Sequence, residues 1–182
     1  AKYTLRADEM FLNRMIGGTF EGSNDPDFRE KEVLYLINEK PKRLQTVVQS
    51  YSSKSYRYVR YIGPKDSHCN IAEAAFYTPN DTASLKGKVI GTPGCFQKDG
   101  SHEYTNVFDG DVTTSFDYIE SSGGWSGLDL GTPKQIGKIV YTPRNYDNYV
   151  CHGDDYELFY CSQDKWKSLG KQTSYADSLV YK

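Results

Sequence analysis

The stretch Asn106-Val-Phe-Asp-Gly-Asp111, followed by Trp125-Ser-Gly-Leu-Asp-Leu-Gly131, is the most informative part of this chain of 182 residues. Asp109-Gly110-Asp111 predicts a tight acidic turn, because Asp and Gly favour turn backbone and carboxylates can hydrogen-bond it. The second segment predicts a short strand, from Trp125 to Leu130, that carries Trp125, Leu128 and Leu130 and ends at a Gly131 turn. Together the two segments indicate a β-sandwich binding module and not an enzyme.

Short runs with period-two alternation extend this prediction along the chain. In Tyr56-Arg-Tyr-Val-Arg-Tyr-Ile62, aromatic and β-branched residues alternate in the way that is typical of strands. Similar runs are bounded by Gly, Pro, Asn or Asp, so we predict an all-β fold, an antiparallel β-sandwich of jelly-roll type. A short helix is expected near residues 8–16. The expected strands are 33–37, 56–62, 71–77, 88–91, 126–130, 136–141, 155–160 and 179–181.

Composition excludes several classes of function. The net charge of -2 gives no basic excess for phosphate neutralisation, so we expect no nucleic-acid partner. The sequence has no apolar run of the length that spans a membrane. The absence of a CxxC pair argues against a zinc ribbon or thioredoxin-like site. We expect most of the four cysteines to be free, with Cys151 and Cys161 as the first pair to test for a disulfide.

An internal repeat relates the beginning of the chain to its later part. Tyr3-Thr-Leu-Arg6 parallels Tyr141-Thr-Pro-Arg144, and in each copy a loop follows the arginine. A strand then begins with an aromatic-Glu pair, Phe20-Glu21 in the first copy and Tyr156-Glu157 in the second. The alternative is a chance similarity between two β segments.

These motifs resemble the discoidin-like domain, the coagulation-factor V/VIII type C family within the galactose-binding-like fold. The front half of such a domain resembles Asn106-Val-Phe-Asp-Gly-Asp111, Gly127-Leu-Asp-Leu-Gly131, Ile136-Gly-Lys-Ile-Val-Tyr-Thr-Pro-Arg144 and Tyr156-Glu-Leu-Phe-Tyr160. The back half resembles Gly18-Thr-Phe-Glu-Gly-Ser-Asn-Asp25, Tyr56-Arg-Tyr-Val-Arg-Tyr61 and Asn70-Ile-Ala-Glu-Ala-Ala-Phe-Tyr77. Relatives of this kind are modules of multi-domain proteins secreted by bacteria. The resemblance therefore implies an exported protein that is extracellular, periplasmic or on the cell surface.

The order of the halves departs from the family pattern. The back half, residues 1–79, precedes the front half, residues 80–182, with a Pro/Asn/Asp/Thr-rich boundary at 78–84. The chain could be cut from a tandem array, or the two parts could form one permuted module. Because an isolated half-sandwich would expose apolar faces and edge strands, we expect the two parts to pack together as one sandwich.

The acidic turn is a candidate calcium site. Asp109, Asp111 and Thr114 offer carboxylates, a hydroxyl and carbonyls, the hard oxygen ligands that calcium prefers. The resemblance implies that a Glu on the last strand, here Glu73, completes a structural site. Glu73 must then lie next to Asp109. The alternative is an Asp-Gly turn with capping carboxylates and no metal.

The candidate ligand site is the loop 144–152, which mixes aromatic and polar side chains. Sugars bind to flat apolar faces that are surrounded by hydrogen-bonding groups. The residues that we predict to bind the ligand are Arg144, Asn145, Tyr146, Asn148, Tyr149 and His152. The loop 6–14 is the counterpart in the first copy, and Tyr118 and Trp125 are further candidates. The alternative is a polar surface loop in which the tyrosines serve as packing anchors.

Catalysis has little support in the sequence. His68, His102 and His152 lie in unrelated contexts, and nothing specifies the separation of Glu73 and Glu157 as a glycosidase pair. We therefore predict a non-catalytic carbohydrate-binding or glycan-binding module, with a loop braced by calcium, in a larger exported protein. The alternative is a structural or protein-interaction module that supports a catalytic domain of the same polypeptide and has no sugar site.

Overall fold

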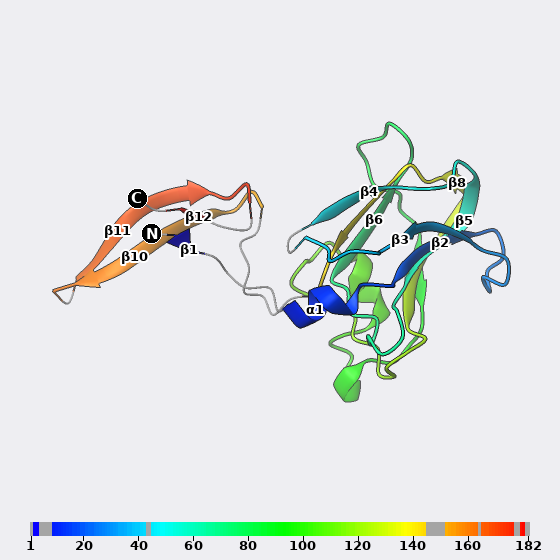
Figure 1. Cartoon of the computed structure of the whole chain (residues 1–182), viewed down its shortest axis with the longest axis horizontal. Helices are drawn as coiled ribbons and strands as arrows, with labels where there is room; N and C mark the ends of the chain where they lie inside the picture. Colours follow the sequence, from blue (N-terminus) through cyan, green and yellow to red (C-terminus); the bar gives the residue numbers. More distant parts are fainter. Residues whose placement is uncertain are drawn as a thin grey trace.

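The computed structural model describes residues 2–3, 9–42, 45–144, 152–163, 165–176 and 179–180. Most of the described elements are strands, which form a β-sandwich and a second, smaller β-structure (Figure 1). In chain order the elements are β1 (Lys2–Tyr3), α1 (Glu9–Arg14), β2 (Thr19–Ser23), β3 (Glu32–Leu36), β4 (Thr46–Gln49), β5 (Ser55–Ile62), β6 (Glu73–Tyr77), β7 (Lys88–Gly91), the 3-10 helices η1 (Phe96–Lys98) and η2 (Tyr104–Phe108), β8 (Trp125–Gln135), β9 (Lys138–Thr142), β10 (Asp155–Ser162), β11 (Lys165–Thr173) and β12 (Leu179–Val180).

The sandwich consists of two antiparallel sheets. One sheet has the strand order β3-β2-β5-β8-β7, and the other has the order β4-β9-β6. The pairing of β5 with β8 aligns Tyr61 with Ser126, and β9 lies between β4 and β6. Each sheet therefore combines strands from before and after residue 79. The prediction of an all-β antiparallel sandwich is confirmed.

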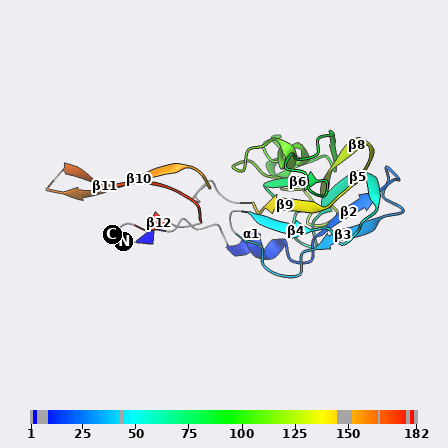
Figure 2. The same cartoon turned by 90° about the horizontal axis from the view of Figure 1, so that it is seen from above.

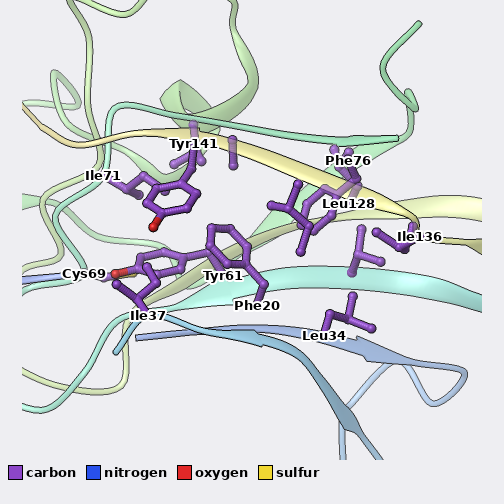
Figure 3. Packing of buried hydrophobic residues seen from close by; sticks show 14 of the residues in the cluster. Phe20, Leu34, Ile37, Tyr61, Cys69, Ile71, Phe76, Leu128, Ile136 and Tyr141 are labelled. Atoms are coloured by element: carbon purple, nitrogen blue, oxygen red, sulfur yellow. The ribbon is translucent and has the colours of Figure 1, made fainter. Parts of the chain in front are cut away.

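Aromatic side chains from both sheets fill the core (Figure 3). The ring of Phe20 lies 5.1 Å from that of Tyr61, 5.2 Å from that of Tyr141 and 6.0 Å from that of Phe76, measured between ring centroids. All four side chains are buried. Because large aromatic rings remove much apolar area from water, this cluster is a main source of the sandwich's stability.

The outer face of the larger sheet carries a buried ion pair instead of an apolar layer. Arg60 donates to a carboxylate oxygen of Glu21 through Nε at 2.8 Å, with Nη2 at 2.7 Å from the same oxygen. The guanidinium carbon lies 4.1 Å from the ring centroid of Phe28 and 5.1 Å from that of Trp125. Lys31 adds a second cation, 2.9 Å from Glu21. The charges in this layer are thus paired and covered by rings.

Four further strands form the smaller β-structure, which lies apart from the sandwich in both views (Figures 1 and 2). β10 pairs with β11, and β1 pairs with β12, in both cases antiparallel. Leu179 is buried there, with Tyr156 and Leu158 packed against it. Several large side chains of this part are exposed, namely Phe159, Tyr160, Trp166, Leu169, Tyr175 and Val180. A two-stranded ribbon buries little apolar area by itself, so this part has a weak core.

Three cysteines of the described residues are free thiols: Cys69 and Cys95 are buried, and Cys161 is exposed. Cys151 lies outside the described residues. Burial raises the pKa of the Cys69 thiol to about 12, which keeps it neutral and unreactive. Among the helices of the described residues, none has the length and apolar character needed to cross a bilayer.

Two core tyrosines give a test of this packing. The hydroxyl of Tyr61 is buried and has no hydrogen-bond partner among the described residues, whereas that of Tyr56 lies 2.7 Å from Ser52 Oγ. We expect Tyr61→Phe to raise the free energy of unfolding by about 1 kcal/mol, because it removes an unsatisfied polar group. Tyr56→Phe should lower it by about 1 kcal/mol through loss of a hydrogen bond. Urea denaturation measures the free energy of unfolding of both variants. Equal losses would show that the Tyr61 hydroxyl is not an unsatisfied polar group.

Candidate functional site

The acidic turn follows directly after η2 and is folded by its own side chains. Gly110 has φ +86, a left-handed conformation that glycine adopts without a steric penalty. Asp109 accepts from the backbone N–H of Asp111 at 2.8 Å and from the Thr114 hydroxyl at 2.8 Å. Asp111 accepts from the backbone N–H of Thr113 at 2.9 Å. These bonds hold the turn in one conformation.

Strand β6 brings Glu73 to this turn. Glu73 Oε1 accepts from the backbone N–H of Gly110 at 2.9 Å, which brings its carboxyl group close to that of Asp109. Burial, then the neighbouring Asp109 carboxyl, raise the pKa of Glu73 to about 8, against the opposing effect of the Gly110 and Asp111 backbone N–H groups. The raised pKa favours a proton on Glu73 at pH 7, and a bound cation would relieve the same repulsion between the two carboxyl groups.

Of the four residues predicted to bind metal, three present their oxygens together: Glu73, Asp109 and Thr114. Asp111 instead directs a carboxylate oxygen to Thr113, and these hydrogen bonds lower its pKa. The described part of the chain contains no group of three or more His, Cys, Asp and Glu side chains that could hold a metal. The site thus offers two carboxylates and a hydroxyl, with backbone carbonyls nearby. Such a set of hard oxygens suits calcium better than a transition metal.

The predicted ligand residues are distributed over different parts of the structure. Arg144 follows β9 and is buried: Nη1 donates to Asp117, and the guanidinium carbon lies 4.7 Å from the ring centroid of Phe11. His152 belongs to the smaller β-structure, where its ring lies 5.7 Å from that of Tyr175. The remaining predicted ligand residues, Asn145, Tyr146, Asn148 and Tyr149, lie outside the described residues.

Arg144 begins a chain of buried polar contacts that ends at the surface. Asp117, which accepts from Arg144, also accepts from Asn70 Nδ2 at 2.7 Å. Asn70 Oδ1 in turn accepts from Arg14 Nη1 at 2.7 Å. The ring of Phe11 lies under both guanidinium groups, 5.8 Å from that of Arg14. This network fixes the direction of Arg14, the last residue of α1, from inside the sandwich.

A pocket of about 520 Å³ lies at this end of the sandwich. Its lining consists of Met10, Asn13, Arg14, Ile16, Pro64, Lys65, Asp66 and Ser67. The loop that forms one wall has left-handed backbone at Asp66 (φ 60), His68 (φ 55) and Cys69 (φ 52), which is uncommon for residues other than glycine. His68 Nδ1 donates to the carbonyl oxygen of Tyr118 at 3.0 Å and anchors the loop. Such conformations often occur at functional loops.

Tyr118 and Trp125, the two additional ligand candidates, are both involved in packing. Tyr118 lies against Phe116, with ring centroids 6.0 Å apart. Trp125 packs on the outer face of the sheet against Phe28, at 5.6 Å between centroids, and beside the Arg60 guanidinium. Neither belongs to the lining of the pocket beside α1.

One feature of the sequence points to this pocket. The segment 6–14 is the counterpart of the loop 144–152 in the internal repeat, and it contains Asn13 and Arg14. The opposite wall, 64–67, has no motif beyond a Gly-Pro turn. Comparisons with protein-family models, with curated proteins and with solved structures find no match to this chain.

The buried network makes a specific prediction about stability. Asp117→Ala leaves the buried Arg144 guanidinium without its carboxylate, so we expect a loss of roughly 3–5 kcal/mol in the free energy of unfolding. Lys54→Ala, which removes an exposed ion pair with Glu32, should cost at most about 1 kcal/mol. Urea denaturation measures both variants. Equal, small losses would show that the network does not hold this end of the sandwich together.

Proposed function

We propose that this chain is a non-catalytic carbohydrate-binding module of the discoidin-like type, and that the pocket beside α1 receives the sugar. The observation that carries this proposal is the position of Arg14. A buried chain of contacts through Asn70 and Asp117 directs its guanidinium at the wall of an open pocket. A binding site needs polar groups that are fixed before the ligand arrives, since their ordering then costs no binding free energy.

The chemistry of the lining supports a polyhydroxylated ligand. Asn13, Asp66 and Ser67 can donate or accept hydrogen bonds, and the pocket also holds two cationic side chains. Met10 and Ile16, which are 42% and 41% exposed, offer apolar surface to the C–H face of a sugar ring. The volume lies in the range of about 300–1,000 Å³ that is typical of small-molecule sites.

We further propose that calcium braces the acidic turn. Glu73, Asp109 and Thr114 would hold the ion, and its charge would offset the cost of burying Glu73 and the repulsion between the two carboxylates, which together raise the pKa of Glu73. The fit is supported by the donor set and by the contact between Glu73 and the turn. The role is structural, because the ion would tie the turn to β6. The resemblance in the sequence also supports placing the module in a larger exported protein.

A protein-interaction role is the second candidate, and exposed aromatic residues of the smaller β-structure favour it. Trp166 and Tyr175 are 73% and 74% exposed, and Phe159 is 47% exposed. Exposed aromatic residues are more frequent in interaction surfaces than on the rest of a protein's surface. The two roles are compatible, since they involve different parts of the chain.

The sugar site is tested by titration of the full chain with a panel of mono- and disaccharides, followed by isothermal calorimetry. We expect at least one sugar to bind saturably and Arg14→Ala to abolish the heat, because the fixed guanidinium is lost. Arg29→Ala, a matched change at an exposed arginine outside the pocket, should bind as the unmodified protein does. The proposal fails if no sugar binds, or if Arg14→Ala binds equally well.

The calcium site is tested by thermal unfolding with calcium and with chelator. An excess of about 100-fold over the dissociation constant should stabilise the protein by about 2.7 kcal/mol. Glu73→Gln should abolish this gain, whereas Glu120→Gln, at an exposed acid, should keep it. In chelator at pH 4 or below, Glu73→Gln should change little, because Glu73 is then largely protonated in both the folded and the unfolded chain.

The pH dependence of stability in chelator is a control for the role of Glu73. The folded-state pKa of Glu73 exceeds that of the unfolded chain, so its contribution to stability is lost as the pH rises through about 8. The unmodified protein should therefore lose stability between pH 4.5, the ordinary pKa of a glutamate, and about pH 8. Glu73→Gln should lose less over the same range. Melting temperatures that do not respond to calcium would contradict the metal site and leave the sugar test unaffected.

A further inference from the structure

Arg14 differs from the other arginines of the described residues in its charge partner. Four of these five arginines pair with a carboxylate, in the pairs Arg29 with Asp25, Arg57 with Asp129, Arg60 with Glu21 and Arg144 with Asp117. Arg14 Nη1 donates instead to Asn70 Oδ1, the oxygen of a neutral amide. Among the described residues Arg14 has no carboxylate partner, so its positive charge is not balanced within that part of the chain.

The bond to Asn70 leaves one edge of the Arg14 guanidinium group unoccupied. Nε and Nη2 of Arg14 have no hydrogen-bond partner among the residues that the structure describes. The same two nitrogens of Arg57 donate to the two carboxylate oxygens of Asp129, at 2.8 and 2.9 Å, and Arg29 uses its Nε and Nη2 in the same way. This edge is a planar fork that matches the geometry of a carboxylate. In two other arginines of this chain the fork therefore binds the group that Arg14 lacks.

The network behind Arg14 fixes its position without balancing its charge. Asp117 carries the negative charge of this network, and it accepts hydrogen bonds from both Arg144 and Asn70. The amide of Asn70 lies between Asp117 and Arg14, so the carboxylate is paired with Arg144 and not with Arg14. A cation that is held in place and is not neutralised is suited to binding an anion, since its ordering costs no binding free energy.

The free fork of Arg14 belongs to the pocket beside α1. Arg14 is half-buried and lines this space of about 520 Å³. Lys65, on the opposite wall, is exposed and has no ion pair within the described ranges. Asp66 is the single acidic residue of the lining, and its Oδ1 accepts from the hydroxyl of Ser121, which lies outside the lining, at 3.3 Å. Two cations and one acid give the lining a formal charge of +1.

We propose that this pocket binds an acidic sugar, one that carries a carboxylate group. The proposal rests on the sugar site proposed above and names the class of sugar. Nε and Nη2 of Arg14 would hold the two carboxylate oxygens, Lys65 would add a second positive charge, and Met10 and Ile16 would contact the C–H face of the ring. A formal charge of +1 balances a carboxylate better than a phosphate monoester, which carries a charge of about −1.5 to −2 at pH 7.

The test compares galacturonic, glucuronic and N-acetylneuraminic acid with their methyl esters, by isothermal calorimetry on the full chain near pH 7. Each ester keeps the sugar ring and removes the charge. We expect at least one acid to bind about tenfold or more tightly than its ester, because hydrogen bonds to charged groups are stronger than those to neutral groups. The ratio of the two affinities should fall at higher ionic strength, since salt screens the attraction.

Two variants assign this preference to the pocket. Lys65→Glu reverses one charge of the lining at an exposed position, and it should lower the ratio of acid affinity to ester affinity about tenfold. Arg14→Lys keeps the positive charge but has no planar fork, so it should also lower this ratio. Lys86→Glu, at an exposed lysine outside the lining, is the matched control and should leave the ratio unchanged.

Acids that bind no more tightly than their esters would overturn the proposal, whereas binding of the esters or of neutral sugars would leave the sugar site in place. The absence of binding by any sugar would overturn both. A preference that persists in Lys65→Glu and in Arg14→Lys would place the carboxylate outside the pocket. Acetate that binds as tightly as the acids would show that a carboxylate is recognised without a sugar ring, and it would overturn the proposal as well.

Discussion

Strands β5 and β8 approach so closely at Gly127 that a Cβ atom there would lie 2.3 Å from the carbonyl oxygen of Val59. The same atom would lie 2.7 Å from the Cβ of Arg60. This contact joins the strands from the first part of the chain to those from the second, and the centre of the larger sheet depends on it. The apolar core lies on one face of this sheet and the Arg60–Glu21 ion pair on the other. Both require the strand register that this close contact sets.

Both candidate sites depend on contacts between the same two parts of the chain. Glu73 comes from β6 and meets a turn that lies beyond residue 100. The polar network begins at Arg14 and Asn70 and ends at Asp117 and Arg144. The lining of the pocket comes from the first part alone, but the network that orients Arg14 and the calcium site both need the two parts, so they form only when the sandwich has assembled. Folding and the preparation of the sites are therefore one event.

Much of the fold could be predicted from the sequence, because many strands are short runs rich in aromatic and β-branched residues that are bounded by turn residues. The predicted strands at 56–62 and 88–91 match β5 and β7 almost residue for residue. Strand β11, Lys165–Thr173, was missed because its side chains are largely exposed and lysine-rich, which removes the alternation. Strand β4, Thr46–Gln49, was missed because Gln45 and Ser50 flank it, and the Gly, Pro, Asn or Asp residues that bound the predicted runs are absent there.

The sites were predictable only where a local motif or the resemblance to a known family indicated them. The acidic turn and its link to Glu73 were expected, and the structure places them in contact. The contacts of Asn70 with Arg14 and Asp117 span 56 and 47 positions, and no local pattern records such pairs. Arg144 was expected at a ligand surface, but the structure buries it at the root of the network. A polar residue after a strand does not by itself indicate whether it faces inward or outward.

The pairing of β1 with β12 has a consequence for mechanical load. The two strands are antiparallel, with Lys2 opposite Val180 and Tyr3 opposite Leu179, so a pull applied ahead of Lys2 and behind Val180 acts on the same end of the pair. Force in this direction peels the hydrogen bonds apart one at a time instead of shearing them together. The smaller β-structure would therefore open first under tension and act as an extensible segment, while the sandwich and its sites stay intact.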